Sequence, residues 1–196
     1  FLICTLRAIY KTVVRNFLKT MRRTLLLLLF IGLSYQNLIA CKCDGSEDIE
    51  KSYNGSEVIV HGKVVSKEFV NLSQSLTAKG LELVCNSYQT DNQILEFLET
   101  EFLIKIELEV IQKYKGDGLT KTITVYTAKT SGACGYLEFE TGKEYQIYLS
   151  STCYFDFQFK KANLDKKHYN GLWTNRCTMT KEFNISEDKK LKKLME

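Results

Sequence analysis

The clearest strand signal in the sequence is Phe102-Leu-Ile-Lys-Ile-Glu-Leu-Glu-Val110, in which every second side chain is apolar and Lys105, Glu107 and Glu109 lie between them. Successive side chains of a β-strand point to opposite faces, so this alternation predicts one face against a core and one face in water. The segment Lys115-Gly-Asp-Gly118 then favours a turn, and Lys121-Thr-Ile-Thr-Val-Tyr126 favours a further strand.

Three other segments complete the predicted sheet. Residues 58–65 are rich in β-branched side chains, with Gly62 indicating a bulge or a close approach, and residues 144–149 and 153–159 alternate in the same way. Five short strands separated by turn residues are typical of a small closed or partly open barrel. The predicted fold class is therefore mostly β, with a five-stranded OB-fold-like barrel.

Short helices are expected to flank this barrel. Ser46 is a candidate N-cap for a helix that Asn54-Gly55 would end, and Ser186 is a candidate N-cap for a helix at the tail. The charges of that tail favour a solvated helix face. Residues 66–100 are polar, and we expect them to be irregular.

The first 40 residues have the character of a leader. They hold six basic residues and no acidic one, whereas all 23 acidic residues follow Ala40 together with 21 of the 27 basic ones. The remainder therefore has a net charge of −2, which argues against a nucleic-acid-binding surface. Arg22-Arg23, the apolar run at 25–33 and a short polar stretch before Cys41 are typical of a secretory signal peptide.

The apolar run is too short for a transmembrane span, because crossing a bilayer takes about 20 residues. We expect translation to start at Met21, residues 1–20 to be absent from the mature protein, and residues 41–196 to form a single secreted domain.

Removal of the leader leaves six cysteines. An even number in a small exported domain predicts a disulfide framework, although fifteen pairings are possible. The Cys41-Lys-Cys43 pair has no second close pair, and His61 and His168 stand alone, so we expect no metal site or cofactor within the chain. The six are Cys41, Cys43, Cys85, Cys134, Cys153 and Cys177.

Several of these patterns occur in one order. Cys41-Lys-Cys43 is followed by Gln112-Lys-Tyr-Lys-Gly116, then Val125-Tyr-Thr-Ala128, Cys134-Gly-Tyr136 and Ser151-Thr-Cys153. In this order the chain resembles the amino-terminal, netrin-like (NTR) domain of the tissue inhibitors of metalloproteinases. The resemblance implies disulfides Cys41–Cys134 and Cys43–Cys153. The family has a further cysteine where this chain has Tyr53, so we expect a relocated Cys85–Cys177 bridge.

The resemblance also implies a function, the inhibition of zinc metalloproteases by a monomeric secreted protein. The α-amine and carbonyl of Cys41 would chelate the zinc of the target protease, which is the only metal involved. Lys42 would enter the specificity pocket of the protease, Cys43 would fix the ridge, and Asp44 would continue it. Members of the family usually carry a small hydroxyl residue where this chain has Lys42, and an apolar residue where it has Asp44. The contact surface would be completed by Ser131, Gly132, Ala133 and Cys134.

Two other interpretations remain open. Leu38-Ile-Ala-Cys41 also fits a bacterial lipobox, in which lipidation of Cys41 would anchor the chain to an envelope and leave Cys134 without that partner. Alternatively, the domain is a netrin-like binding module without inhibitory activity. Enzymatic activity is not expected, because no serine or cysteine nucleophile is accompanied by a partnered histidine.

Overall fold

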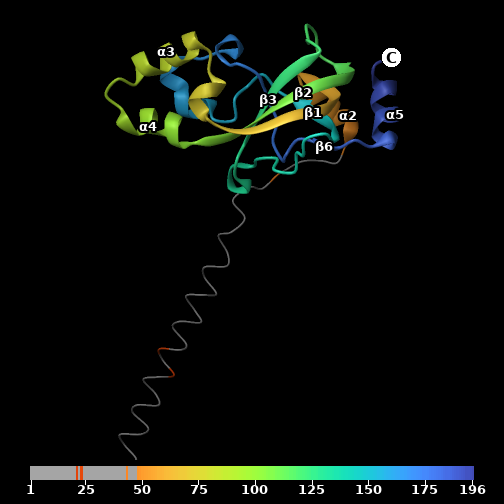
Figure 1. The fold of residues 1–196 in the computed structure, drawn as a ribbon, viewed down its shortest axis with the longest axis horizontal. Coiled ribbons are helices and arrows are strands. Elements are labelled where there is room, and N and C mark those ends of the chain that lie inside the picture. The colour runs from red at the N-terminus through yellow and green to blue at the C-terminus, as the bar shows by residue number, and fades with distance from the viewer. Residues whose placement is uncertain (1–20, 22, 24–42, 44–47) are drawn as a thin grey trace, which may run out of the picture. The chain divides into compact units, whose positions relative to one another are not determined.

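The computed structural model describes Met21, Arg23, Cys43 and residues 48–196. Cys43 and residues 48–196 belong to one compact unit, which is considered by itself below. This unit is mostly β, with a curled six-stranded sheet that forms a half-barrel and short helices at its two ends (Figure 1). Within the described residues, no helix is both long enough and apolar enough to cross a membrane.

The sheet has the strand order β5-β3-β2-β1-β4-β6. The parallel pair is β3 with β5, and the other neighbours are antiparallel. Trp173 in β5 also exchanges two backbone hydrogen bonds with Ser150, the residue after β4, at 2.8 and 2.9 Å. The strands are β1 (Val58–Asn71), β2 (Phe102–Lys115), β3 (Thr122–Ala128), β4 (Glu144–Leu149), β5 (Leu172–Trp173) and β6 (Lys181–Glu182).

The alternating stretch in β2 is confirmed as a half-buried strand from Ile104 to Leu108, whereas Phe102, expected on the core face, is exposed. Ile104, Ile106 and Leu108 are buried, whereas Lys105 and Glu107 are partly exposed and form an ion pair with each other. The buried side chains pack into a cluster with apolar residues of β1, β3 and β4. Burial of this apolar area is the main term that stabilises the sheet.

Gly62 is a point of close approach between β1 and β2. The register of the pair shifts between His61 and Gly62, and a Cβ atom at Gly62 would lie 2.6 Å from the side chain of Leu108. No larger residue fits there without moving one of the strands. The expected bulge or close approach at Gly62 is therefore confirmed.

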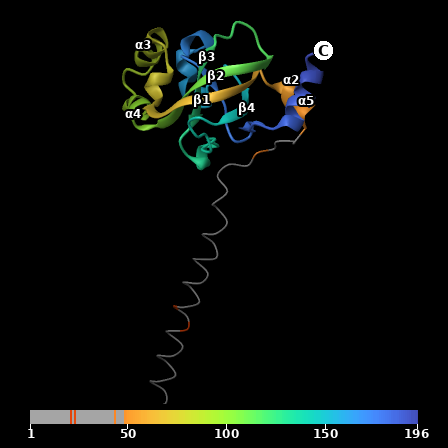
Figure 2. The ribbon, with the colours of Figure 1, turned by 45° about the vertical axis from the view of Figure 1, so that its right-hand side comes forward.

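Two helices lie side by side at one end of the sheet, α2 (Ile49–Gly55) and α5 (Ile185–Leu194) (Figures 1 and 2). Both helices were expected. The N-cap of α5 is Asn184 rather than Ser186, and its side chain accepts hydrogen bonds from two backbone N–H groups. Asp48 caps α2 in the same way. The helices cover a small cluster that contains Tyr114 and Tyr148 of the sheet.

The opposite end of the sheet is covered by helices that were not expected. Between β1 and β2 the chain forms α3 (Ala78–Ser87) and α4 (Asn92–Thr100), so the prediction of an irregular segment is wrong (Figure 1). Thr77 and Asp91 cap these helices through their side chains. Val84 and Leu98 are buried against a second core cluster.

The predicted strand at residues 153–159 is also wrong. Asp156–Ala162 is a 3₁₀ helix, in which the backbone N–H of Gln158 donates to the carbonyl of Phe155. Phe155 and Phe159 are buried four residues apart, whereas Phe157 is 57% exposed. The aromatic residues at 155, 157 and 159 fit a period of two, but only the helical pair enters the core.

The attachment of α5 predicts a dependence of stability on pH. The Asp188 carboxylate pairs with Lys192 at 2.9 Å and accepts a hydrogen bond from the Tyr114 hydroxyl at 2.6 Å, and in that order these contacts lower the pKa of Asp188. The resulting stabilisation is present above the unfolded pKa of about 4 and is lost as the pH falls through the folded value. Asp188→Asn should therefore lower the free energy of unfolding at neutral pH and have a smaller effect in acid.

Urea unfolding at about pH 7 and about pH 3 measures this difference. Asp117→Asn, at an exposed position in the turn after β2, is the matched control and should leave the pH dependence unchanged. The same destabilisation by Asp188→Asn at both pH values would contradict the assignment.

Candidate functional site

The described part of the predicted contact surface consists of Cys43 and the loop after β3. Cys41, Lys42 and Asp44 lie outside the described residues. Ser131–Ala133 form one 3₁₀ turn, and Cys134 follows it with a left-handed φ of 55°. A non-glycine residue adopts that conformation at a cost of about 1–2 kcal/mol, so neighbouring contacts must hold the loop in place.

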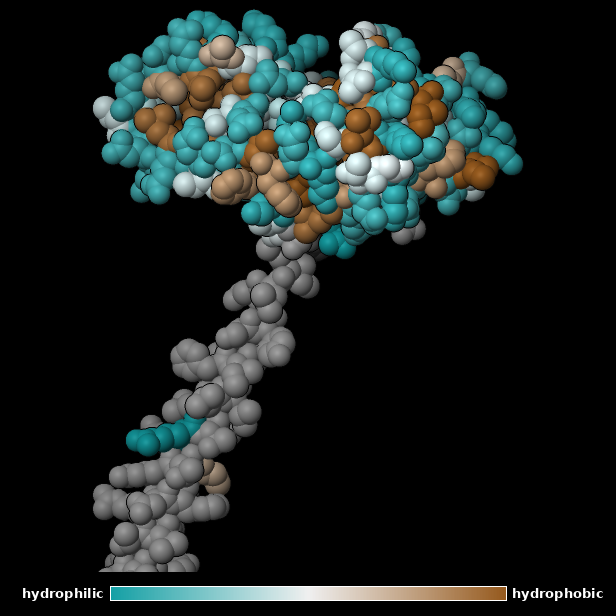
Figure 3. All heavy atoms as spheres, in the orientation of Figure 1, coloured by the Kyte–Doolittle hydropathy of each residue, from teal (hydrophilic) through white to brown (hydrophobic). Residues whose placement is uncertain are grey.

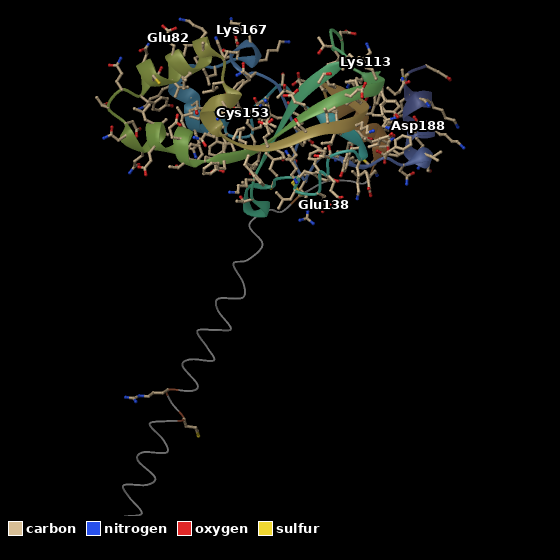
Figure 4. All side chains as sticks on the ribbon, in the orientation of Figure 1. Glu82, Lys113, Glu138, Cys153, Lys167 and Asp188 are labelled. Carbon is tan, nitrogen blue, oxygen red and sulfur yellow. A yellow bond between two sulfur atoms is a disulfide. The ribbon has the colours of Figure 1, made fainter. Side chains whose placement is uncertain are left out.

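The disulfide in the described residues joins Cys43 to Cys177, with Cα atoms 4.9 Å apart. The expected bridges Cys43–Cys153 and Cys85–Cys177 are therefore wrong. Cys153 is buried in the core cluster that α3 and α4 cover (Figure 4), and Cys85 is exposed on α3. Both carry free thiols.

Cys134 is disulfide-bonded, but the Cys41 half of the expected Cys41–Cys134 pairing lies outside the described residues.

A backbone hydrogen bond connects the disulfide to the loop. The N–H of Arg176 donates to the carbonyl of Cys134 at 2.7 Å, directly beside the cysteine that bonds Cys43. Cys43 and the 131–134 loop are thus attached to the same segment, residues 175–178. Two parts of the predicted surface that are about 90 residues apart in the chain are brought together in this way.

The 131–134 loop is fixed to β3 by short-range contacts. The carbonyl of Thr130 accepts hydrogen bonds from the N–H groups of Ala133 and Gly135, at 3.2 and 3.0 Å. A Cβ atom at Gly135 would lie 1.8 Å from the carbonyl oxygen of Ala128, so only glycine fits. The buried hydroxyl of Thr127 then accepts from the N–H of Tyr136. The loop therefore returns onto the strand from which it starts.

The segment that carries Cys177 is held to β4 by threonine hydroxyls. Thr174 donates to the carbonyl of Tyr148, and the hydroxyl of Thr180 accepts from the N–H of Tyr148, both at 3.0 Å. The two hydroxyls are also 2.7 Å apart. Between them, the side chain of Asn175 accepts from the N–H groups of Cys177 and Thr178. These contacts fix the disulfide relative to the sheet.

A pair of exposed phenyl rings lies next to this site. Phe69 is 62% exposed and Phe102 is 41% exposed, and the ammonium of Lys129 stands over both rings at 5.2 and 4.8 Å. Lys129 lies two residues before the 3₁₀ turn of the loop. Cation–π contacts of this kind hold exposed rings in place and leave their outer edges open to a partner.

The described residues offer little nucleophilic or metal-binding chemistry. Burial raises the pKa of the Cys153 thiol to about 12, so the thiol stays protonated at neutral pH. His61 is buried, pairs with Glu144 at 2.8 Å and stacks on Phe183. Among the described residues there is no group of three or more histidine, cysteine or acidic side chains that could hold a metal ion.

Sequence reasoning missed the residues that support the site. Thr174, Asn175 and Thr180 were not singled out, nor was Arg176, although the Thr-Asn-Arg-Cys-Thr segment contains a usable signal. An asparagine two residues before a cysteine favours a turn in which its side chain accepts from the backbone. The long-range threonine contacts have no such local signal.

Comparison with protein-family models and with curated proteins finds no significant match to this chain. The likeness to the tissue inhibitors of metalloproteinases therefore rests on the ordered motifs alone.

The threonine contacts can be tested by an isosteric substitution. Thr180→Val removes the hydroxyl that accepts from the buried N–H of Tyr148, and we expect a loss of about 1–3 kcal/mol in the free energy of unfolding. Urea denaturation provides the measurement. Thr152→Val, at an exposed position, should change stability by less than about 0.5 kcal/mol. A Thr180 variant as stable as that control would show that the hydroxyls do not hold the segment.

The disulfide assignment can be tested by thiol mapping of the native protein. Alkylation should label Cys85 rapidly and Cys153 only after unfolding, because Cys153 is 3% exposed and its pKa is raised. Proteolysis without reduction should release a peptide pair linked through Cys43 and Cys177. Recovery of a pair that links either of these residues to Cys153 or Cys85 would refute the arrangement.

Proposed function

We propose that this chain is a secreted inhibitor of zinc endopeptidases, similar to the tissue inhibitors of metalloproteinases, that acts through a mature terminus at Cys41. The observation that carries the proposal is the junction at Cys177. Its disulfide to Cys43 and the hydrogen bond from Arg176 to Cys134 attach the terminal segment and the 131–134 loop to one support. An inhibitory ridge built from these two segments requires such a support.

The chemistry follows from the zinc of the target protease. A catalytic zinc keeps one coordination position for the water that it activates. The free α-amine of Cys41, with an ordinary pKa of about 8, would be partly neutral near pH 7 and could replace that water together with the Cys41 carbonyl. A terminus held by the Cys43 bridge loses little entropy on insertion, which favours binding.

The neighbouring residues would determine which proteases are inhibited. Lys42 would enter the specificity pocket, and Asp44 would continue along the cleft. The proposal therefore implies a target whose pocket accepts a long cation. The backbone of the 131–134 loop would form the second side of the contact. Cys134 keeps this loop against the 175–178 segment through its carbonyl.

We further propose that strands β1 to β5 form an OB-fold-like, netrin-like barrel. The support is the position of β5, which pairs in parallel with β3 and bridges Ser150 through Trp173. These contacts give the ring β1-β2-β3-β5-β4, which returns to β1 because β1 pairs with β4. Such a barrel would present the terminal segment on a rigid base.

The alternative is a netrin-like binding module without inhibitory activity. The exposed rings of Phe69 and Phe102 favour it, because a protein partner could cover them without contacting Cys41. Figure 3 shows apolar side chains interspersed with polar ones on one face of this unit. In the inhibitor proposal the same rings would lie beside the ridge and need not take part.

The chemical state of Cys41 distinguishes a secreted protein with a free terminus from a lipid-anchored one. A free terminus would be compatible with chelation, whereas acylation of the thiol and amine would prevent it. The intact mass of the mature protein distinguishes the two states, since a diacylglyceryl group adds a characteristic mass. A mature chain that begins elsewhere would remove the proposed zinc ligand.

The inhibitor proposal predicts a strict requirement for the position of the α-amine. The mature chain should inhibit at least one member of a panel of zinc endopeptidases, and one alanine added before Cys41 should raise the inhibition constant about 100-fold or more, since the amine then misses the metal. One alanine added after Glu196 is the matched control and should have no effect.

A panel that remains fully active at concentrations of the wild-type protein well above micromolar would overturn the inhibitor proposal. Equal inhibition by the extended and wild-type chains would favour a contact through the sheet instead.

A further inference from the structure

A cavity of about 590 Å³ lies beside the Cys43–Cys177 disulfide. Its walls come from Cys43, from Ile49 of α2, from the segment before and within β6, and from the first turns of α5. Ile49, Met179 and the disulfide form an apolar part of the wall. The remainder is polar and includes charged side chains of both signs. Which kind of ligand fits therefore depends on which hydrogen-bonding groups of the wall are still available.

The carboxylate and amide oxygens of Glu187 and Asn184, which line this cavity, already have partners. One carboxylate oxygen of the buried Glu187 accepts from the hydroxyl of Tyr148 at 2.7 Å, and the other pairs with Lys181. The amide oxygen of Asn184 accepts from the N–H groups at the start of α5. A cation entering the cavity would therefore have to displace protein donors from these oxygens.

Several donor groups of the cavity, in contrast, have no partner in the described part of the chain. The guanidinium of Arg176 and the ammonium of Lys190 form no ion pair there, and they come from different segments of the chain. The amide nitrogen of Asn184 and the hydroxyl of Ser186 line the same cavity and likewise make no hydrogen bond among the described residues. Spare donors that include two cationic side chains without an ion pair in this described part favour an anion.

We propose that this cavity binds the sulfate or phosphate group of a monoester. The anionic group accepts from Arg176 and Lys190, with Asn184 and Ser186 as neutral donors, and the carbon skeleton of the ester contacts the apolar wall at Met179. Lys181 and Glu187 neutralise each other, whereas Arg176 and Lys190 form no ion pair among the described residues. The site requires neither protease inhibition nor a free Cys41 amine.

The test is calorimetric titration of the full chain at constant ionic strength, with chloride as the reference anion. The probes are inorganic sulfate, inorganic phosphate, glucose 6-sulfate and glucose 6-phosphate. The probe that binds with the highest affinity identifies the source of the anionic group. The double substitution Arg176→Gln with Lys190→Gln should raise the dissociation constant about tenfold or more, because two charged donors are lost.

Lys189→Gln is the matched control, because Lys189 is exposed on the same helix but does not line the cavity. It should change the dissociation constant less than about twofold. Thermal unfolding should be equal for all variants, since Arg176 and Lys190 are exposed.

Absence of saturable binding of all four probes would overturn the proposal. An equal loss of affinity in the Lys189 control would also overturn it, because it would indicate a diffuse attraction to the basic helix.

Discussion

The structure depends on the pairing of β1 along both of its edges. β1 pairs with β2 over nearly its whole length, and its first half, Val58–Lys63, pairs also with β4. Within this doubly paired half, Leu108 of β2 occupies the space that a side chain at Gly62 would need. A side chain at this position would separate β1 from β2 and, with them, move β4. The double pairing of β1 therefore depends on a glycine at position 62.

The candidate site is attached to the sheet through β4. The backbone of Tyr148 holds the hydroxyls of Thr174 and Thr180, and the segment between them carries Cys177, which bonds Cys43. Buried N–H and C=O groups without partners are costly, so these contacts resist movement of the segment. The position of Cys43 is therefore set by the sheet, through the segment that carries Cys177.

The periodicity of apolar residues predicted the long strands, but it failed where one set of residues fits both the period of a strand and that of a helix. The alternation in β2 has a single interpretation between Ile104 and Leu108, because the apolar residues there lie on one face and Lys105 and Glu107 on the other. The aromatic residues at 155, 157 and 159 fit both a strand and a helix, and only packing against the core decides between them. α3 and α4 had signals that were available, namely the caps at Thr77 and Asp91. The Cys43–Cys177 bridge had none, since fifteen pairings are consistent with six cysteines.

The proposed terminal ridge and the proposed anion cavity share the 175–178 segment. The backbone N–H of Arg176 holds Cys134 at the ridge, while its side chain lines the cavity, and Cys177 contributes to both through its disulfide. A ligand that binds only the ordered segment stabilises that order by mass action. If a partner at the ridge requires the same order, each ligand strengthens the other by an equal factor. The coupling would act through the segment itself, because Arg176 is the residue whose backbone and side chain serve different sites.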